Sequence, residues 1–528
     1  MDFYSEIINL IILGNIHNKI ELHKAKIILC KKYGINAIPA DSEIIAKLTQ
    51  ELSDEEKDFA ISLLRKKATR SLSGVAIIAV MTSPEECPHG LCIPCPGGLK
   101  YGTPQSYTGH EPAAMRASLN NFDPFLQTQN RLNQLRTIGH PVDKIDFIIM
   151  GGTFTARNPF YQEWFVQRCY DALNGKNSKS LNEAKKLNEK SKNRCIGLTI
   201  ETRPDWFRLR HLDMALYWGA TRVELGIQTV FDNILNIINR GHTVTDSINA
   251  TRIAKNSGFK ICYHMMPNLP LSDFNSDAQA FLTIFEDSRF KPDMIKIYPT
   301  LIVKGTKLFD MWKKGEYKSL ETNDATKLIA KIKTNIPEWI RIQRIQRDIP
   351  SQFIDAGVRN SNLRQFVEKE LEKNKKECRC IRCREIGHKS LKQKIEVDDK
   401  DIGITNIFYE ASDSEEIFIS LVDKKNDAII GYLRLRDIIN SHRIELQKKP
   451  CMIIRELKVV GQELALGKKS KKGLQHRGYG KELLNEAEKI CLEEFDKKNL
   501  LVLSGVGVKP YYRRLGFKDE GVYLLKTL

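Results

Sequence analysis

Cys87-Pro-His-Gly-Leu-Cys92-Ile-Pro-Cys95-Pro-Gly-Gly98 places three cysteines at the spacing C-x4-C-x2-C, directly after the apolar run 75–81. Three thiolates in one short loop can hold three irons of a 4Fe-4S cluster and leave the fourth iron open to a small molecule. The prolines and glycines keep this loop out of helix and sheet, so the sulfurs can converge. Short cysteine runs also form zinc sites, and three unrelated buried thiols would give the same pattern. The loop by itself leaves these alternatives open.

Outward from this loop, strand-like and helical stretches alternate from Val75 to about Pro299. Such alternation predicts a parallel sheet covered by helices, which is an α/β fold. Six βα units are too few for a closed eight-stranded barrel, so we expect a partial (βα)6 barrel. The expected strands are Val75–Met81, Lys144–Met150, Cys195–Ile200, Arg222–Ile227, Phe259–His264 and Met294–Tyr298.

The ends of the expected strands carry glycines and polar residues. In parallel α/β folds, ligands bind at the C-terminal ends of the strands, which is where the cysteine loop lies. One Gly-Gly pair or one polar residue could be a turn or a cap, but five consecutive strand ends favour a functional site. After the cysteines, these ends carry Gly151, Gly152 and Thr153, then Glu201 and Arg203, then Gln228, and finally His264.

Two stretches of this region are harder to interpret. The Lys-, Asn- and Ser-rich segment between Asn174 and Asn193 is interpreted as a solvated insertion in the barrel. The run Arg341-Ile-Gln-Arg-Ile-Gln-Arg347 would place its arginines near one face of a helix, whereas on a strand they would alternate. Arginine suits phosphate recognition through its planar guanidinium, and buried salt bridges are the alternative.

The chain carries 83 Lys and Arg against 65 Asp and Glu, a net charge of +18. This excess favours an anionic partner, with nucleic acid as the leading candidate, although a Lys- and Ile-rich source would bias every protein in this way. Residues 1–73 read as a helical basic module that could contact phosphates, with solvated helix faces as the alternative.

No stretch of the sequence reads as a membrane anchor. There is no run of about 18 apolar residues, and the apolar segment 7–13 lacks a small-residue cleavage site, so it reads as an amphipathic helix. We therefore expect a cytoplasmic protein whose 12 cysteines are reduced and available to metal.

A second tight cysteine set lies at Cys378, Cys380 and Cys383. In a reducing compartment, C-x-C-x2-C is typical of a zinc loop. The fourth ligand is left open, because His388, a residue of another domain or water could supply it. A basic linker whose thiols bind no metal is the alternative.

The sequence becomes strand-rich from about Ile395. The loop Gln475-x-x-Gly478-x-Gly480 opens a helix, and free backbone N–H groups at a helix start bind pyrophosphate. It follows the strand-like run 455–460, which could pair with an extended amide chain, and precedes Tyr511-Tyr512. This combination predicts an acyl-coenzyme A site of the GNAT acetyltransferase kind. A dinucleotide-binding unit is disfavoured because a βαβ frame and a ribose-binding acid are missing.

A three-cysteine cluster barrel followed by an acetyl-CoA domain resembles the catalytic subunit of the Elongator complex, a tRNA wobble-uridine carboxymethylating enzyme. The resemblance covers nearly the whole chain, and the compact C-x4-C spacing favours an archaeal-type relative, a tRNA uridine(34) acetyltransferase. Besides the cysteine loop, the matching stretches are 105–109, 123–127, 150–154, 201–205, 240–243, 264–267, 298–301, 346–350, 504–507 and 511–512.

Four parts are predicted. They are a helical tRNA-binding module at 1–73, a radical-SAM partial barrel at 74–365, a zinc-binding linker at 366–393 and an α+β GNAT domain at 394–528.

The resemblance also implies a chemistry. S-adenosylmethionine would bind the open iron, and its reductive cleavage would give a 5′-deoxyadenosyl radical that takes hydrogen from the acetyl methyl of acetyl-CoA. The carbon radical would add to C5 of uridine 34 in the tRNA anticodon, and thioester hydrolysis would leave 5-carboxymethyluridine. Cofactors supply the difficult chemistry while the protein positions them.

The resemblance assigns roles residue by residue. Cys87, Cys92 and Cys95 would ligate the cluster. Gly151, Gly152 and Thr153 would line the amino end of S-adenosylmethionine, with Glu201, Arg203 and Gln228 near it. Glu456, Leu457, Lys458 and Val459 would pair with pantetheine, and Gln475, Gly478, Tyr479, Gly480, Lys481 and Glu482 would hold the pyrophosphate. Tyr512 would sit by the thioester, and Lys144 would contact acetyl-CoA from the barrel side unless it is a plain surface lysine.

Two other functions compete with this one. A protein or histone lysine N-acetyltransferase would use only the C-terminal domain, and it would have no use for Cys87, Cys92 and Cys95. A nonenzymatic tRNA-binding scaffold would turn over nothing. Whether the chain forms a homodimer or binds other Elongator subunits is left open.

Overall fold

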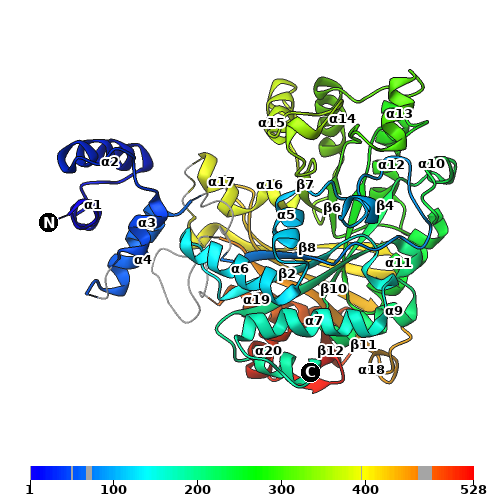
Figure 1. Ribbon diagram of the computed structural model, residues 1–528. Helices are drawn as coiled ribbons and strands as arrows, with labels where there is room; N and C mark the ends of the chain where they lie inside the picture. Colours follow the sequence, from blue (N-terminus) through cyan, green and yellow to red (C-terminus); the bar gives the residue numbers. More distant parts are fainter. Residues whose placement is uncertain (1, 49–50, 67–73, 394, 396, 462–477) are drawn as a thin grey trace.

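Two seven-stranded sheets organise the chain (Figure 1). The computed structural model describes all residues except 1, 49–50, 67–73, 394, 396 and 462–477. Among the described residues, no helix is long and apolar enough to cross a membrane.

The first sheet is parallel throughout and has the order β1-β2-β3-β4-β5-β6-β7. Each strand pairs with the next one along the chain, so the helices between strands cover the outer face of a curled half-barrel, as predicted. The strands are β1 (Ala76–Met81), β2 (Lys144–Met150), β3 (Arg194–Thr202), β4 (Arg222–Gln228), β5 (Lys260–Met265), β6 (Met294–Ile297) and β7 (Arg341–Ile345).

The seventh strand shows the secondary structure of the arginine-rich run 341–347, which the sequence analysis left undecided between helix and strand. Arg341 and Arg344 belong to β7, which pairs with β6 through Ile342 and Ile345. The run is therefore a strand from Arg341 to Ile345, and this strand extends the predicted six-unit barrel by one.

Helices of the barrel begin and end at recognisable signals. Asp123 caps α6 by accepting from the Leu126 N–H, and Pro124 stands at its first position. Gly175 ends α7 in the left-handed region at φ 66°. The helices are α5 (Pro112–Leu119), α6 (Pro124–Thr137), α7 (Pro159–Asn174), α8 (Leu181–Asn188), α9 (Leu209–Trp218), α10 (Asp232–Ile237), α11 (Val244–Lys255), α12 (Phe274–Glu286), α13 (Lys307–Lys313), α14 (Thr322–Thr334) and α15 (Leu363–Lys373).

Helix α8 corrects the expectation of a solvated insertion between Asn174 and Asn193. Leu181 and Ala184 are fully buried, and the Asn188 side chain accepts from the Cys195 N–H at 2.8 Å. The segment is wrongly read as an insertion because its polar residues hide a short apolar stripe that packs against α7.

The second sheet has the order β13-β14-β12-β11-β10-β9-β8 and is mostly antiparallel. Its strands are β8 (Ile402–Ala411), β9 (Ser414–Asp423), β10 (Ala428–Ile438), β11 (Cys451–Val459), β12 (Asn499–Val502), β13 (Lys518–Glu520) and β14 (Tyr523–Thr527). The helices of this part are α16 (Ile381–Arg384), α17 (Ile386–Gln393), α18 (Ile444–Gln447), α19 (Tyr479–Glu493) and α20 (Lys509–Arg514).

Strands β11 and β12 run parallel but pair only from Cys451 to Ile454 on β11. Strand β11 continues to Val459, whereas β12 ends at Val502. The two strands therefore part, and the second half of β11 lacks a β12 partner along that edge.

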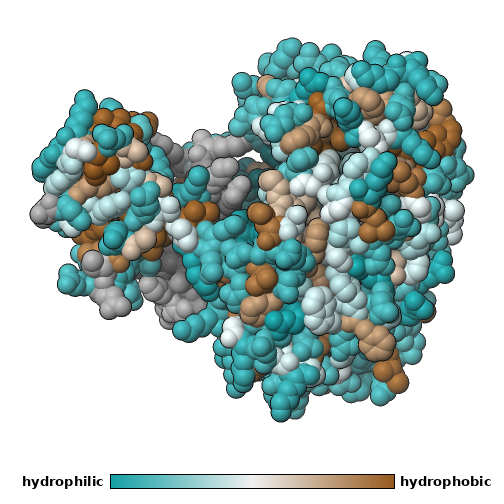
Figure 2. Space-filling view, viewed as in Figure 1, coloured by the Kyte–Doolittle hydropathy of each residue, from teal (hydrophilic) through white to brown (hydrophobic). Residues whose placement is uncertain are grey.

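The N-terminal helices form a separate small module. They are α1 (Phe3–Ile12), α2 (Lys19–Tyr33), α3 (Asp41–Ala46) and α4 (Asp54–Leu64), and they share an apolar core of their own. The module stands to one side of the body (Figures 1 and 2) and meets it where Arg65 donates to the Gly139 carbonyl at 2.8 Å. The four domain boundaries given above remain predictions.

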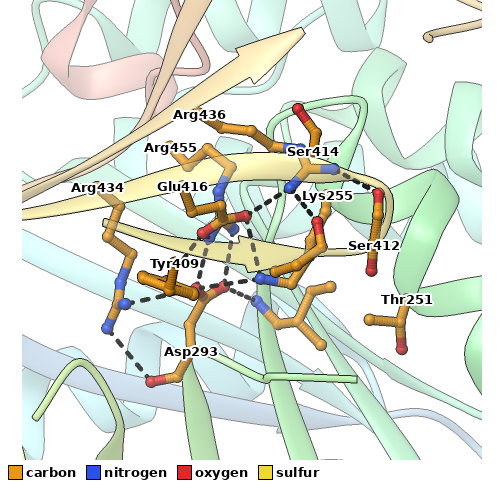
Figure 3. Close-up of polar contacts among 12 residues, drawn as sticks. Thr251, Lys255, Asp293, Tyr409, Ser412, Ser414, Glu416, Arg434, Arg436 and Arg455 are labelled. Atoms are coloured by element: carbon orange, nitrogen blue, oxygen red, sulfur yellow. Dashed lines mark hydrogen bonds and ion pairs between the residues drawn. The ribbon is translucent and has the colours of Figure 1, made fainter. Parts of the chain in front are cut away.

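The barrel and the second sheet are joined by a continuous apolar core that includes Ile453, Leu501 and Tyr523 from the second sheet. A cluster of buried charges lies in the same interface (Figure 3), and we call it the interface ion cluster. It consists of Lys255 and Asp293 from the barrel, and Glu416, Arg434, Arg436 and Arg455 from the second sheet.

Asp293 and Glu416 are the two acceptors in this cluster. Arg455 contacts both carboxylates, at 2.5 Å for Asp293, and Lys255 lies 3.0 Å from Glu416. Burial opposes ionisation, but Arg455 and Lys255 hold the pKa of Asp293 well below its usual range and lower the pKa of Glu416 to about 2. Both acids are therefore anionic, and each depends on cations of the other domain.

We predict that Asp293→Asn destabilises the protein by about 3–5 kcal/mol, because breaking a buried ion pair leaves uncompensated charge. The measurement is the urea midpoint of unfolding. Asp287→Asn is the matched control, since Asp287 pairs with Arg289, whose side chain is 62% exposed, and an exposed pair contributes less than about 1 kcal/mol. Equal shifts for the two variants would contradict the prediction.

Candidate active site

A single cavity of about 1180 Å³ extends through the barrel to the second sheet. At one end it is lined by Cys87 of the cysteine loop and by Gly152. At the other end it is lined by the free edge of β11 and by the start of α19. Two sites that the sequence placed about 390 residues apart therefore open into one chamber.

Most of the site residues predicted from the sequence line this cavity, and a few do not. Those lining the cavity are Cys87, Lys144, Gly152, Thr153, Glu201, Arg203, Gln228, Glu456, Leu457, Lys458, Val459, Gly478, Tyr479, Gly480, Lys481 and Tyr512. Cys92, Cys95, Gly151 and Glu482 are not among the lining residues. Gln475 lies outside the described residues.

The cysteine loop has backbone and side-chain donors aimed at its sulfurs. The Ser106 N–H donates to Cys95 Sγ at 3.1 Å, and His89 Nε2 lies 3.0 Å from Cys92 Sγ. Arg240 Nη1 is 3.8 Å from the same sulfur. Burial raises the pKa of Cys95 to about 11, so the thiolate form requires a positive partner.

The spacing of these sulfurs separates a cluster from a single ion. Within the described parts of the chain, Cys87, Cys92 and Cys95 do not form a set with all sulfurs within 4.8 Å of one another. Tetrahedral zinc, with Zn–S bonds of about 2.3 Å, requires sulfurs roughly 4 Å apart. The loop therefore fits a multi-iron cluster better than one zinc ion.

The Gly-Gly turn after β2 brings backbone close to the cysteines. Gly151 has φ +127°, and a Cβ there would lie 2.1 Å from Thr82 Oγ1, so only glycine fits. Thr153 Oγ1 is 3.6 Å from Cys87 Sγ. Among the described residues, the buried Arg203 Nη1 and Gln228 Oε1 have no hydrogen-bond partner, which leaves polar atoms at this end for a ligand.

At the opposite end, the second sheet offers an open edge and a helix start. Residues 456–459 of β11 lie beyond the last β12 pair and line the cavity. Helix α19 begins at Tyr479 after Gly478, whose φ of 94° turns the chain into the helix. An extended amide chain can pair with such an edge, and a helix N-terminus attracts anionic phosphate.

Tyr512 and Lys144 face this end from different domains. Tyr512, on α20, is buried against Tyr511 and Phe517, and burial raises its pKa above the usual value for tyrosine. Lys144 is the first residue of β2 and pairs in register with Arg194, the first residue of β3. Cations at the beginnings of the barrel strands thus face the second sheet.

The second cysteine set is compact. The sulfurs of Cys378, Cys380 and Cys383 lie within 4.8 Å of one another, which suits a single ion. His388 is not part of this set in the described chain; its Nε2 lies 3.7 Å from a carboxylate oxygen of Glu385.

The barrel interior holds charged residues that the sequence analysis did not single out. Glu224 and Lys296 are buried, contact each other and line the cavity, and Tyr107 donates to Glu201 at 2.9 Å. Strands of a parallel sheet are normally apolar on both faces. The charges of Arg222-Val-Glu224 at alternate positions could have signalled a polar interior.

Comparison with known proteins agrees with this arrangement. Residues 1–72 match the ELP3 N-terminal domain, residues 83–280 the Radical SAM superfamily, residues 292–373 the Radical_SAM C-terminal domain, and residues 385–517 the Acetyltransferase (GNAT) family. A radical SAM domain joined to a GNAT domain defines an enzyme of the acyltransferase class.

Individual relatives match over nearly the whole chain. The tRNA uridine(34) acetyltransferase of Methanocaldococcus jannaschii is 50% identical over 514 residues, covering 97% of this chain and 94% of that protein. Elongator complex protein 3 of Drosophila melanogaster is 40% identical over 519 residues, covering 96% and 93%. The solved structure of archaeal Methanocaldococcus infernus Elp3 with an N-terminal deletion (1–46) has a TM-score of 0.77 at 46% identity, covering 87% of this chain and 100% of that one. The chain belongs to the Elongator complex protein 3 family.

The shared cavity depends on close contact between the two domains at Gly505. A Cβ on Gly505 would lie 2.0 Å from the Ile196 carbonyl oxygen on β3. We predict that Gly505→Ala lowers the free energy of unfolding by about 1–3 kcal/mol, because a backbone atom must move. The measurement is again urea unfolding.

Gly403→Ala serves as the matched control. A Cβ on Gly403 would meet only the flexible side chain of Lys424, at 2.5 Å. We expect this control substitution to lower the free energy of unfolding by less than about 0.5 kcal/mol, which is typical of a surface substitution. A Gly505→Ala protein as stable as the control would show that the domains do not need this approach.

Proposed function

We propose that this chain is a tRNA uridine(34) acetyltransferase that uses S-adenosylmethionine, a 4Fe-4S cluster and acetyl-CoA to form 5-carboxymethyluridine at the wobble position. The observation that carries this proposal is the single cavity that joins the cysteine loop to the free edge of β11. A chemistry that couples two cofactors requires such a chamber, because a carbon radical must meet the acetyl group before it meets solvent.

At the barrel end, Cys87, Cys92 and Cys95 would hold the cluster, which when bound supplies the electron for reductive cleavage of S-adenosylmethionine. Gly151, Gly152 and Thr153 would line the amino end of S-adenosylmethionine, and Gly152 and Thr153 are on the cavity wall. Glu201, Arg203 and Gln228 would orient the remainder of that molecule, and the unpartnered atoms of Arg203 and Gln228 support this role.

At the GNAT end, the edge of β11 from Glu456 to Val459 would pair with the pantetheine amides. The loop from Gln475 to Glu482, including Gly478, Tyr479, Gly480 and Lys481, would hold the pyrophosphate. Tyr512 would sit by the thioester and Lys144 would contact acetyl-CoA from the barrel side, which fits their positions on the cavity wall.

The partner proposed for the outer surface is the tRNA anticodon. The net charge of +18 favours a polyanion, and the face seen in Figure 2 is mainly hydrophilic with small hydrophobic patches. We place the protein in the cytoplasm, where tRNA is modified. A homodimer is a further proposal, and the name of the relatives, Elongator complex protein 3, suggests other Elongator subunits as partners.

The test is anaerobic reconstitution of the full chain with iron and sulfide, followed by incubation with S-adenosylmethionine, a reductant, acetyl-CoA and tRNA. Mass analysis of the anticodon nucleosides should show 5-carboxymethyluridine. Cys92→Ser should abolish it while acetyl-CoA binding by calorimetry is retained.

Three outcomes would count against the proposal. Product from the Cys92→Ser protein would exclude the radical mechanism. Transfer of acetyl groups to lysine peptides, without change in the tRNA, would favour a protein or histone lysine N-acetyltransferase. Absence of all turnover would favour a tRNA-binding scaffold.

We further propose that Cys378, Cys380 and Cys383 bind structural zinc, supported by the compact set of sulfurs. Cys380→Ser should lower the zinc content of the purified protein from about one ion per chain to a small fraction of that, because three thiolates dominate the site. Cys169→Ser, at a buried thiol outside this set, is the control. Equal zinc in both variants would contradict the assignment.

A further inference from the structure

Cys92 differs from the other two cysteines of its loop in the groups that meet its sulfur. Cys92 Sγ lies 3.0 Å from the imidazole Nε2 of His89 and 3.8 Å from the guanidinium Nη1 of Arg240. The sulfurs of the other two cysteines contact neutral groups among the described residues, including a threonine hydroxyl at 3.6 Å and a serine N–H at 3.1 Å. The charged donor is therefore concentrated on the middle sulfur of the loop.

The segment 238–241, which follows α10, is bonded to the cysteine loop on both sides of Cys92. The Asn239 side chain donates to the Leu91 carbonyl at 3.0 Å. The Ile93 N–H donates to the first carbonyl of the segment, also at 3.0 Å. The two pieces of chain are about 150 positions apart in the sequence, yet they are held together at this cysteine.

The same segment fixes the two donors. Arg240 is buried, and its Nη2 donates to the Gly226 carbonyl at 2.9 Å, so its guanidinium is anchored on the side away from the sulfur. Gly241 has φ +73°, and a Cβ there would lie 2.5 Å from the Cβ of His89. Only glycine allows this approach, which packs backbone directly against the histidine side chain.

Both groups donate to the sulfur when Cys92 ligates iron. A thiolate has no proton to give, so Nε2 of His89 must carry the hydrogen, and a guanidinium is a donor only. Among the described residues, the buried Nδ1 of the His89 ring has no hydrogen-bond partner, so the sulfur is the polar contact that orients the ring. His89 and Arg240 therefore stabilise negative charge on Cys92 Sγ.

A competing explanation is that His89 is itself a ligand of the iron that Cys92 holds. Two ligands of one tetrahedral metal, with bonds of about 2.3 Å to sulfur and about 2.0 Å to nitrogen, lie roughly 3.5 Å apart. The observed separation of 3.0 Å is shorter. Ligands of two different irons would be farther apart still, because they point away from the centre of a cluster. The geometry fits a hydrogen bond to sulfur.

We propose that His89 and Arg240 raise the reduction potential of the 4Fe-4S cluster by donating hydrogen bonds to the Cys92 thiolate. The inference rests on the proposed function, in which the cluster is loaded and takes up one electron. In that step one electron passes from a low-potential donor to the cluster, which gains one negative charge, and no bond forms or breaks. Hydrogen bonds to the ligating sulfurs stabilise the more negative form, so they make the cluster easier to reduce.

The test is a redox titration of the reconstituted full chain, followed by electron paramagnetic resonance, without S-adenosylmethionine, tRNA or acetyl-CoA. At a fixed potential, the ratio of reduced to oxidised cluster should fall about tenfold in Arg240→Met, which corresponds to a midpoint about 59 mV more negative for a one-electron couple. His89→Leu should shift the midpoint in the same direction. A changed spectrum of His89→Leu with an unchanged midpoint would indicate ligation and overturn the proposal.

His242→Leu is the matched control. His242 is a buried histidine two residues after Arg240, and neither ring nitrogen has a hydrogen-bond partner in the part of the chain that the structure describes. Burial and the neighbouring arginines hold the pKa of His242 well below its usual range, so its replacement removes no charge. The midpoint should be unchanged.

A second control separates loop anchoring from donation to sulfur. Asn239→Gly removes the bond to the Leu91 carbonyl, and glycine accepts the φ of 54° at this position. Its midpoint should also equal that of the native protein. A shift in either control as large as that of Arg240→Met would show that the segment only holds the loop, and would overturn the proposal.

Conservative variants decide the outcome if the first pair takes up no iron. Arg240→Lys keeps the charge and His89→Gln keeps an N–H donor, so each should shift the midpoint less than the larger change at the same position. Failure of all four variants to take up iron would show that these residues build the loop rather than tune the cluster, and would overturn the proposal.

The remaining outcomes separate this inference from the proposed function. Unchanged midpoints in the loaded variants would overturn the role of His89 and Arg240 and leave the proposed function in place. A native chain that shows the expected shifts but forms no 5-carboxymethyluridine would overturn the proposed function alone. A native chain that takes up no 4Fe-4S cluster would overturn both.

Discussion

The contact between Asp293 and Arg455 in the interface ion cluster is the interaction on which the rest of the structure depends. Asp293 precedes β6 of the barrel, and Arg455 lies on β11 of the GNAT sheet immediately before the edge that lines the cavity. Arg434 extends the same chain of contacts to Glu456 at 2.9 Å. A buried charge without its partner is far more costly than a lost apolar contact, so the two domains have one favourable alignment. That alignment lets residues of both domains line one cavity.

The cavity shared by the two domains has a chemical consequence. A seven-stranded half-barrel has two unpaired edges and an interior that cannot be packed solid, unlike a closed eight-stranded barrel, which is filled by layers of apolar side chains. Here the GNAT domain covers the interior, and charged residues occupy it. Buried charges interact strongly, so Lys296 holds the pKa of Glu224 well below its usual range and the Glu224 carboxylate raises the pKa of Lys296.

The same architecture places different groups of cavity residues at the two ends of the barrel strands. The carboxyl ends of the strands carry the cysteine loop, the Gly-Gly turn and His264, and the amino ends of β2 and β3 carry Lys144 and Arg194. The two ends are separated because each residue along a strand advances about 3.3 Å. Residues from both ends line the same cavity.

The sequence by itself determined the features that local patterns encode. The C-x4-C-x2-C loop, the alternation of strands and helices and the Gly-rich helix start are set by residues close together in the chain, so the half-barrel and the GNAT domain could be predicted. The sequence analysis did not predict strand β7 or helix α8. Tertiary packing, rather than local propensity, determines the secondary structure of a short arginine-rich run and of a polar segment with a narrow apolar stripe. Only the tertiary structure decided that both sites share a cavity, that Asp293 meets Arg455 across 162 positions, and that His264 meets Glu224 across 40. Those contacts join residues far apart in the chain, and no local pattern carries the distance between them.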